Sequence, residues 1–72
     1  MSDKYYIPYM NVCVKAFAKR FDLPLRNAFN YLNRFKGMDF LVNTYEAEHQ
    51  LSIDDAVDDL AIVCNRNGGL IR

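Results

Sequence analysis

Apolar residues recur at steps of three and four along most of this 72-residue chain, a spacing typical of amphipathic helices. No stretch of useful length alternates apolar and polar residues, as a half-buried strand does. Four segments carry the helical pattern, and turn-forming residues separate them. The sequence therefore predicts an all-α fold, a compact bundle of four short helices over residues 6–21, 24–36, 38–50 and 53–66.

Proline and glycine set the limits of the first two predicted helices. Pro8 is tolerated only in a first turn, so the first helix begins at Ile7 or within one turn before it. A residue that precedes proline avoids the helical region, so this helix ends before Pro24, which can open the second one. Gly37 suits the left-handed residue that ends the second helix.

The last predicted helix has its own start and stop signals. Ser52 is a typical N-cap residue, and Asp55, three positions later, is placed as its capping-box partner. Gly68-Gly69 stops the helix. We expect residues 67–72 to form a tail that frays or folds back.

The length supports a single helical domain over residues 1–72, and 51% of its residues are apolar. No apolar run approaches the roughly 20 residues of a membrane helix, and no signal peptide is visible, so we expect a soluble, cytoplasmic protein. Residues at the centres of the apolar stripes should form the core. These are Phe17, Phe29, Leu32, Leu41, Tyr45, Val57 and Leu60.

The charges are segregated along the chain, although the net charge is zero. Residues 1–36 carry seven basic and two acidic side chains, and residues 37–72 carry two basic and seven acidic ones. Faces of opposite sign can steer a charged partner or stack molecules head to tail. Alternatively, the basic and acidic helices neutralise one another inside the bundle. Zero net charge argues against generic nucleic-acid binding, which depends on neutralising phosphates.

The sequence contains no catalytic or metal motif. Cys13 and Cys64 fall on apolar stripes, where a free thiol behaves as a small hydrophobe, and no closely spaced Cys or His pair is typical of a zinc site. His49, the only histidine, is placed near a helix end, where one ring N–H can be donated to a carbonyl. We therefore expect no enzymatic activity, no cofactor, no metal and no small-molecule substrate.

Some side chains are not accounted for by the predicted core, and these are candidates for binding a protein partner. Three are aromatic residues away from the main stripes, and tyrosine is enriched at interfaces. Two are aspartates beyond the first turn of the last helix, where like charges repel at i,i+4 spacing. The five are Tyr9, Tyr31, Phe40, Asp58 and Asp59. Alternatively, another helix covers the rings, and the chain's own cations neutralise the aspartates.

The polar side of the second predicted helix allows a different function. Arg and Asn are the side chains that read guanine and adenine edges, and the preceding turn could imitate a helix-turn-helix. The residues concerned are Arg26, Asn27, Asn30 and Arg34. They indicate a small nucleic-acid-binding regulator as the alternative function, or simply a solvated polar face.

The aromatic-rich first helix ends in Phe17–Phe21, and it is followed by Gly37–Leu41, by Tyr45 with His49, and by the acidic run Asp54–Leu60. In this order the features resemble a family of short bacterial proteins catalogued as a domain of unknown function. Some members are encoded beside toxin-like or ADP-ribosyltransferase-like proteins. The resemblance implies a compact helical bundle with an antitoxin-like or accessory role and no catalytic residues. We therefore expect a protein-interaction module that binds an operon neighbour or self-associates, for example as a homodimer.

Overall fold

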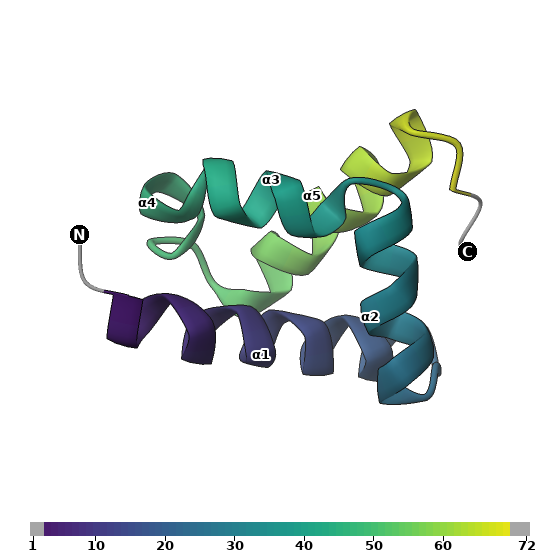
Figure 1. Cartoon of the computed structure of the whole chain (residues 1–72), viewed down its shortest axis with the longest axis horizontal. Coiled ribbons are helices and arrows are strands. Elements are labelled where there is room, and N and C mark those ends of the chain that lie inside the picture. Colours follow the sequence, from purple (N-terminus) through teal and green to yellow (C-terminus); the bar gives the residue numbers. More distant parts are fainter. Residues whose placement is uncertain (1–2, 70–72) are drawn as a thin grey trace.

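The computed structural model describes the backbone of residues 3–69 and the side chains of residues 8–69. Within these residues the chain forms helices and no strands, which confirms the all-α prediction (Figure 1). None of these helices is long and apolar enough to cross a membrane. The helices are α1 (Asp3–Arg20), α2 (Leu25–Arg34), α3 (Gly37–Asn43), α4 (Tyr45–Glu48) and α5 (Ile53–Arg66).

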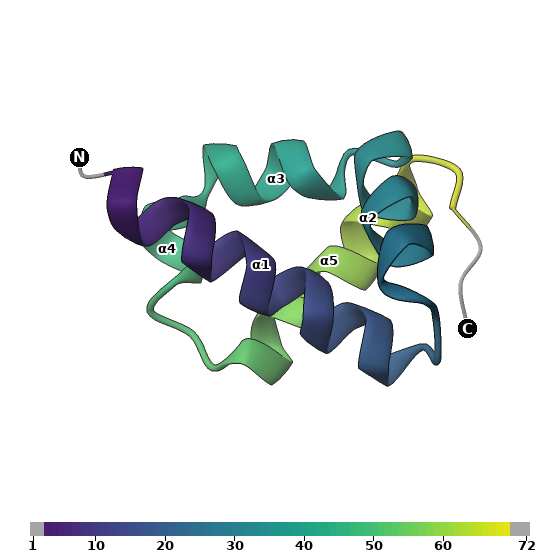
Figure 2. The same ribbon diagram turned by 60° about the horizontal axis from the view of Figure 1, so that its bottom comes forward.

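Two views of the ribbon show how the helices are arranged. α2 turns steeply away from α1 and closes one end of the molecule, and α3 runs back along the other side (Figures 1 and 2). α5 packs against both α1 and α3, so it occupies the middle of the bundle. The core lies where these helices meet, and five of its predicted members are buried as expected. These are Phe17, Leu32, Leu41, Val57 and Leu60, with Tyr45 partly buried.

Phe29 does not belong to this core, so that prediction is wrong. Its side chain is 45% exposed, whereas Ala28 and Leu32 on the same helix are fully buried. Phe29 lies at the edge of the apolar side of α2, one helical turn after Leu25, which is 50% exposed. This edge of α2 is therefore only partly covered.

The predicted helix over residues 38–50 is two helices in the structure, because the chain bends at Thr44. This residue has φ −118° and ψ 21°, and its hydroxyl donates a hydrogen bond to the Phe40 carbonyl at 2.6 Å. A hydroxyl bonded four residues back bends a helix. The bend brings α4 beside α1, where the rings of Tyr9 and Tyr45 meet edge to face with centroids 5.4 Å apart.

The turn between α2 and α3 also differs from expectation. Lys36, with φ 73°, is the left-handed residue, so the prediction for Gly37 is wrong. Gly37 is instead the buried first residue of α3. A Cβ there would lie 2.7 Å from Leu32 Cδ2 and 3.2 Å from Cys64 Sγ, so this glycine allows α2, α3 and α5 to approach closely.

The limits of α5 agree with the sequence. The backbone N–H of Asp55 donates to Ser52 Oγ at 3.1 Å, which confirms Ser52 as the N-cap. The helix ends at Arg66, shortly before Gly68, whose φ is 98°. Residues 70–72 of the expected tail lie outside the described residues.

Candidate functional site

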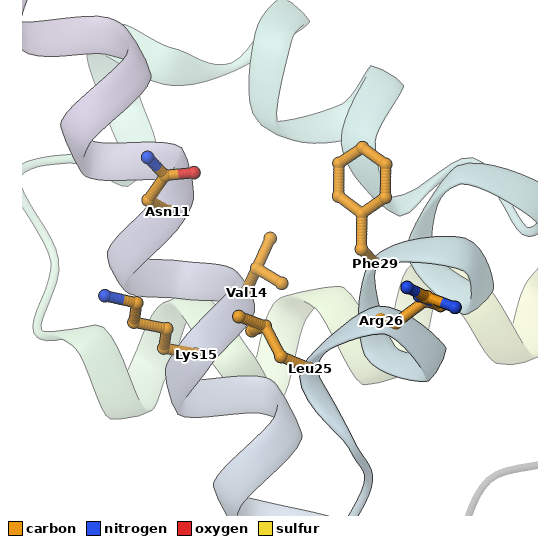
Figure 3. A pocket seen from close by; sticks show the side chains of 6 residues that line it. All are labelled: Asn11, Val14, Lys15, Leu25, Arg26 and Phe29. Atoms are coloured by element: carbon orange, nitrogen blue, oxygen red, sulfur yellow. The ribbon is translucent and has the colours of Figure 1, made fainter.

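An open groove of about 310 Å³ lies between α1 and α2 (Figure 3). Val14 of α1 is almost fully buried at its base, whereas Leu25 and Phe29 of α2 expose about half of their side chains. We call it the α1–α2 groove. Its lining consists of Asn11, Val14, Lys15, Leu25, Arg26 and Phe29.

The local sequence explains why the groove is apolar. Leu25 and Phe29 are four residues apart on α2, so they share one edge of the helix. Asn11, Val14 and Lys15 share one side of α1 for the same reason. α2 turns steeply away from α1 (Figure 2), and among the described residues the lining of the groove comes from these two helices.

The rim of the α1–α2 groove is cationic. Lys15 lies on the α1 side and Arg26 on the α2 side (Figure 3). Among the described residues, neither makes an ion pair or hydrogen bond, whereas Arg20 is paired with Asp54 and Asp58 of α5. An apolar surface between two uncompensated positive charges suits an amphipathic segment that carries acidic residues.

The three aromatic residues predicted to bind a partner pack against the core and keep part of their surface exposed. Tyr9, Tyr31 and Phe40 are all partly buried against the core. The Tyr31 ring stacks on Phe17 with centroids 5.9 Å apart, and the Tyr9 ring contacts Tyr45. Neighbouring residues therefore cover part of each ring, and the binding of a partner at these residues stays a prediction.

The two predicted aspartates have different surroundings. Asp58 is exposed and accepts a hydrogen bond from the Arg20 guanidinium, which ties α5 to the end of α1. Asp59 is less exposed and faces Glu48 of α4. Part of the charge segregation is thus neutralised within the molecule by Arg20.

Glu48 is the unusual titratable group that the sequence reasoning missed. Only 7% of it is exposed, and its Oε1 has no hydrogen-bond partner among the described residues. Burial, together with the nearby carboxylates of Asp59 and Asp55, raises the pKa of Glu48 to about 7. Its helical spacing after Leu41 and Tyr45, four and then three residues, is the signal that could have revealed its burial.

Both thiols are buried, as predicted. Cys13 and Cys64 are fully buried and unpaired. Burial raises the pKa of the Cys13 thiol, and it raises that of Cys64 to about 11. Protonated, buried thiols are poor nucleophiles and poor metal ligands. Within the described residues, no group of three or more His, Cys, Asp or Glu side chains could hold a metal ion.

His49 makes the contact expected of a histidine near a helix end. Its Nδ1 lies 2.7 Å from the carbonyl oxygen of Tyr45, and its ring stacks on the Tyr45 ring with centroids 4.6 Å apart.

The polar residues of α2 that are predicted to bind nucleic acid are all exposed. They are Arg26, Asn27, Asn30 and Arg34, the last of which lies over the Phe35 ring.

The sequence of the chain matches the model of a known protein family. The model of the family described as "Protein of unknown function (DUF3791)" matches residues 8–67. The chain belongs to the DUF3791 family. The match includes every residue of the α1–α2 groove, together with Glu48 and all of α5. No curated protein and no solved structure gave a significant match.

Proposed function

We propose that this DUF3791 protein is a small cytoplasmic protein-interaction module and that the α1–α2 groove is its docking surface. The observation that carries the proposal is a pair of large apolar side chains, Leu25 and Phe29, left about half exposed between the cations Lys15 and Arg26. A small domain gains stability when a second chain covers such a surface.

The magnitudes indicate what kind of partner can bind. Covering the exposed halves of Leu25 and Phe29 contributes roughly 1 kcal/mol each. Association costs at least about 4 kcal/mol, so these two side chains do not hold a partner alone. A tightly bound partner must therefore extend beyond the groove, with carboxylates near the rim cations to set its orientation and its rate of encounter, whereas a partner confined to the groove binds weakly.

We further propose that the chain acts as an antitoxin-like or accessory protein. In this role it binds an operon neighbour or a second copy of itself. It is supported by the resemblance to bacterial proteins encoded beside toxin-like partners. A protein in this role covers a surface of its partner. The apolar lining and the two rim cations of the α1–α2 groove suit such a contact.

The test is capture from a lysate of the cells that naturally produce the chain. A tagged parent is compared with Leu25→Glu, which places a charge in the groove, and with Val42→Glu, which places one at a 47% exposed position of α3. We expect one protein, identified by mass spectrometry, to be retained by the parent and by Val42→Glu and lost with Leu25→Glu. Equal retention by all three, or by none, would refute the groove as the docking surface.

A second candidate function, a nucleic-acid-binding regulator, is favoured by the exposure of Arg26, Asn27, Asn30 and Arg34 on α2. The acidic outer side of α5 opposes it, because those carboxylates repel phosphates. Fluorescence polarisation of a labelled duplex measures whether the chain binds nucleic acid. The salt concentration is about 50 mM, at which electrostatic contacts are stronger than at physiological salt. We expect no binding. Tight, sequence-dependent binding that is lost with Asn30→Ala would favour this second function.

A further inference from the structure

The outward side of α5 carries an apolar residue with acids on its N-terminal side and the cation Arg66 one helical turn after it. Ile62 is 49% exposed, and it lies on the side of α5 opposite the buried Leu60. Asp58 precedes it by one helical turn and Asp55 by two, so the three share one face. We call Asp55, Asp58 and Ile62 the α5 outer face.

This face is complementary to the α1–α2 groove. The groove is an apolar hollow with a cation on each rim, and the α5 outer face is an apolar side chain beside two carboxylates. Asp58 keeps 60% of its side chain exposed while bonded to Arg20. A carboxylate accepts several hydrogen bonds, so Asp58 can receive a second cation.

We propose that the occupant of the groove is the α5 outer face of a second copy of this chain, an inference that rests on the proposed function of the groove. Ile62 of one copy enters the groove of the next, between Leu25 and Phe29. The two rim cations then pair with the two aspartates of the α5 outer face.

The charge segregation favours this arrangement over a face-to-face dimer. The groove belongs to the basic residues 1–36, and the α5 outer face belongs to the acidic residues 37–72. Joining the groove of one copy to the outer face of another brings opposite charges together, whereas groove against groove brings like charges together.

The contact is of the head-to-tail kind. Because the two surfaces share no residue, one molecule can use both at once, and the copies form a chain or close into a ring. A single inserted isoleucine with two ion pairs is a small contact. We therefore expect weak, concentration-dependent and salt-sensitive association.

Light scattering of purified protein, from about 10 µM to about 1 mM, tests the proposal. Leu25→Glu blocks the groove, Ile62→Glu blocks the α5 outer face, and Val42→Glu changes a comparably exposed position outside both. We expect the parent and Val42→Glu to grow in mean mass with concentration, and each blocked variant to remain a monomer. Circular dichroism checks that every variant keeps the helical fold.

The decisive sample is an equimolar mixture of the two blocked variants. The mixture contains one intact groove and one intact outer face, so we expect a mass that rises to that of a dimer and stops there. A parent that stays monomeric, blocked variants that associate like the parent, or a mixture that stays monomeric would each overturn the inference. Groove-dependent capture of a different protein from lysate, with a monomeric parent, would refute self-association and leave the proposed function standing.

Discussion

Replacing the buried Glu48 by glutamine should stabilise the fold at neutral and mildly alkaline pH. Burial and the carboxylates of Asp59 and Asp55 raise the pKa of Glu48 from 4.5 to about 7. Tyr9 and Cys13 face it from α1 and are uncharged at this pH. The folded state therefore holds the proton more tightly than the unfolded chain does.

The sign and the size of the effect follow from this difference. The contribution of the protonated Glu48 is fully present below pH 4.5, is lost as the pH rises to about 7, and is absent above it. At 1.36 kcal/mol per pKa unit, the loss is on the order of 3 kcal/mol. Glu48→Gln has no charge to bury, so its free energy of unfolding should vary much less over this range and exceed that of the parent at about pH 8.

Urea unfolding followed by circular dichroism, at several values between about pH 5 and about pH 8, measures this difference. Glu46→Gln is the matched control, because Glu46 lies in the same turn of α4 and is exposed. It should keep the pH dependence of the parent. A parent whose stability is flat over this range, or a Glu48→Gln variant that falls as steeply as the parent, would refute the reasoning.

Three further substitutions test the packing by urea unfolding. Phe17→Ala should cost about 3–5 kcal/mol because the ring is fully buried, whereas Phe29→Ala should cost about 1 kcal/mol; equal losses would contradict the core assignment. Gly37→Ala should destabilise the fold by about 1–3 kcal/mol because the new Cβ meets the Leu32 side chain, although alanine favours helices. A variant more stable than the parent would contradict the close packing at Gly37. Arg20→Met should lower the free energy of unfolding by less than about 1 kcal/mol, and high salt should abolish this loss because it screens the ion pairs. A large loss that salt does not change would show that the Arg20 side chain acts mainly through packing.

The helical periodicity was sufficient for most of the fold because it reports which side of each helix is apolar. Phe17 and Leu60 lie at the centres of their stripes, and both are fully buried. Periodicity says nothing about how far a neighbouring helix extends over that side. Periodicity therefore predicts Phe29 in the core, although it lies at an edge of α2 that is only partly covered.

Neither the bend at Thr44 nor the buried acid that follows it can be predicted from the pattern of apolar residues. Asn43 and Thr44 are weak helix formers, but apolar residues at helical spacing continue on both sides of them. The hydrogen bond from the Thr44 hydroxyl to the Phe40 carbonyl favours a bend, and a pattern of apolar residues does not report such a bond. Glu48 continues the stripe of Leu41 and Tyr45 and lies near Asp55 and Asp59 of α5, but glutamate is usually exposed, so a pattern of apolar residues does not include it.

The α1–α2 groove could not be predicted because it depends on two helices that meet at a particular angle. The aromatic residues away from the stripes do not lead to this groove, since Tyr9 and Tyr31 are partly buried against the core and do not line it. The useful signal was the pair Leu25 and Phe29 next to Arg26, an apolar edge directly beside a cation. The exposure of that edge is visible only once the position of α1 is known.

The most direct test of the docking surface is site-specific photo-crosslinking inside the cell that naturally produces the chain. A benzophenone side chain replaces Phe29 in the groove in one variant and Val42 outside it in a control. We expect one discrete crosslinked species from position 29, of dimer mass if the occupant is a second copy, and none from position 42. No species from position 29, or the same species from both positions, would contradict the account.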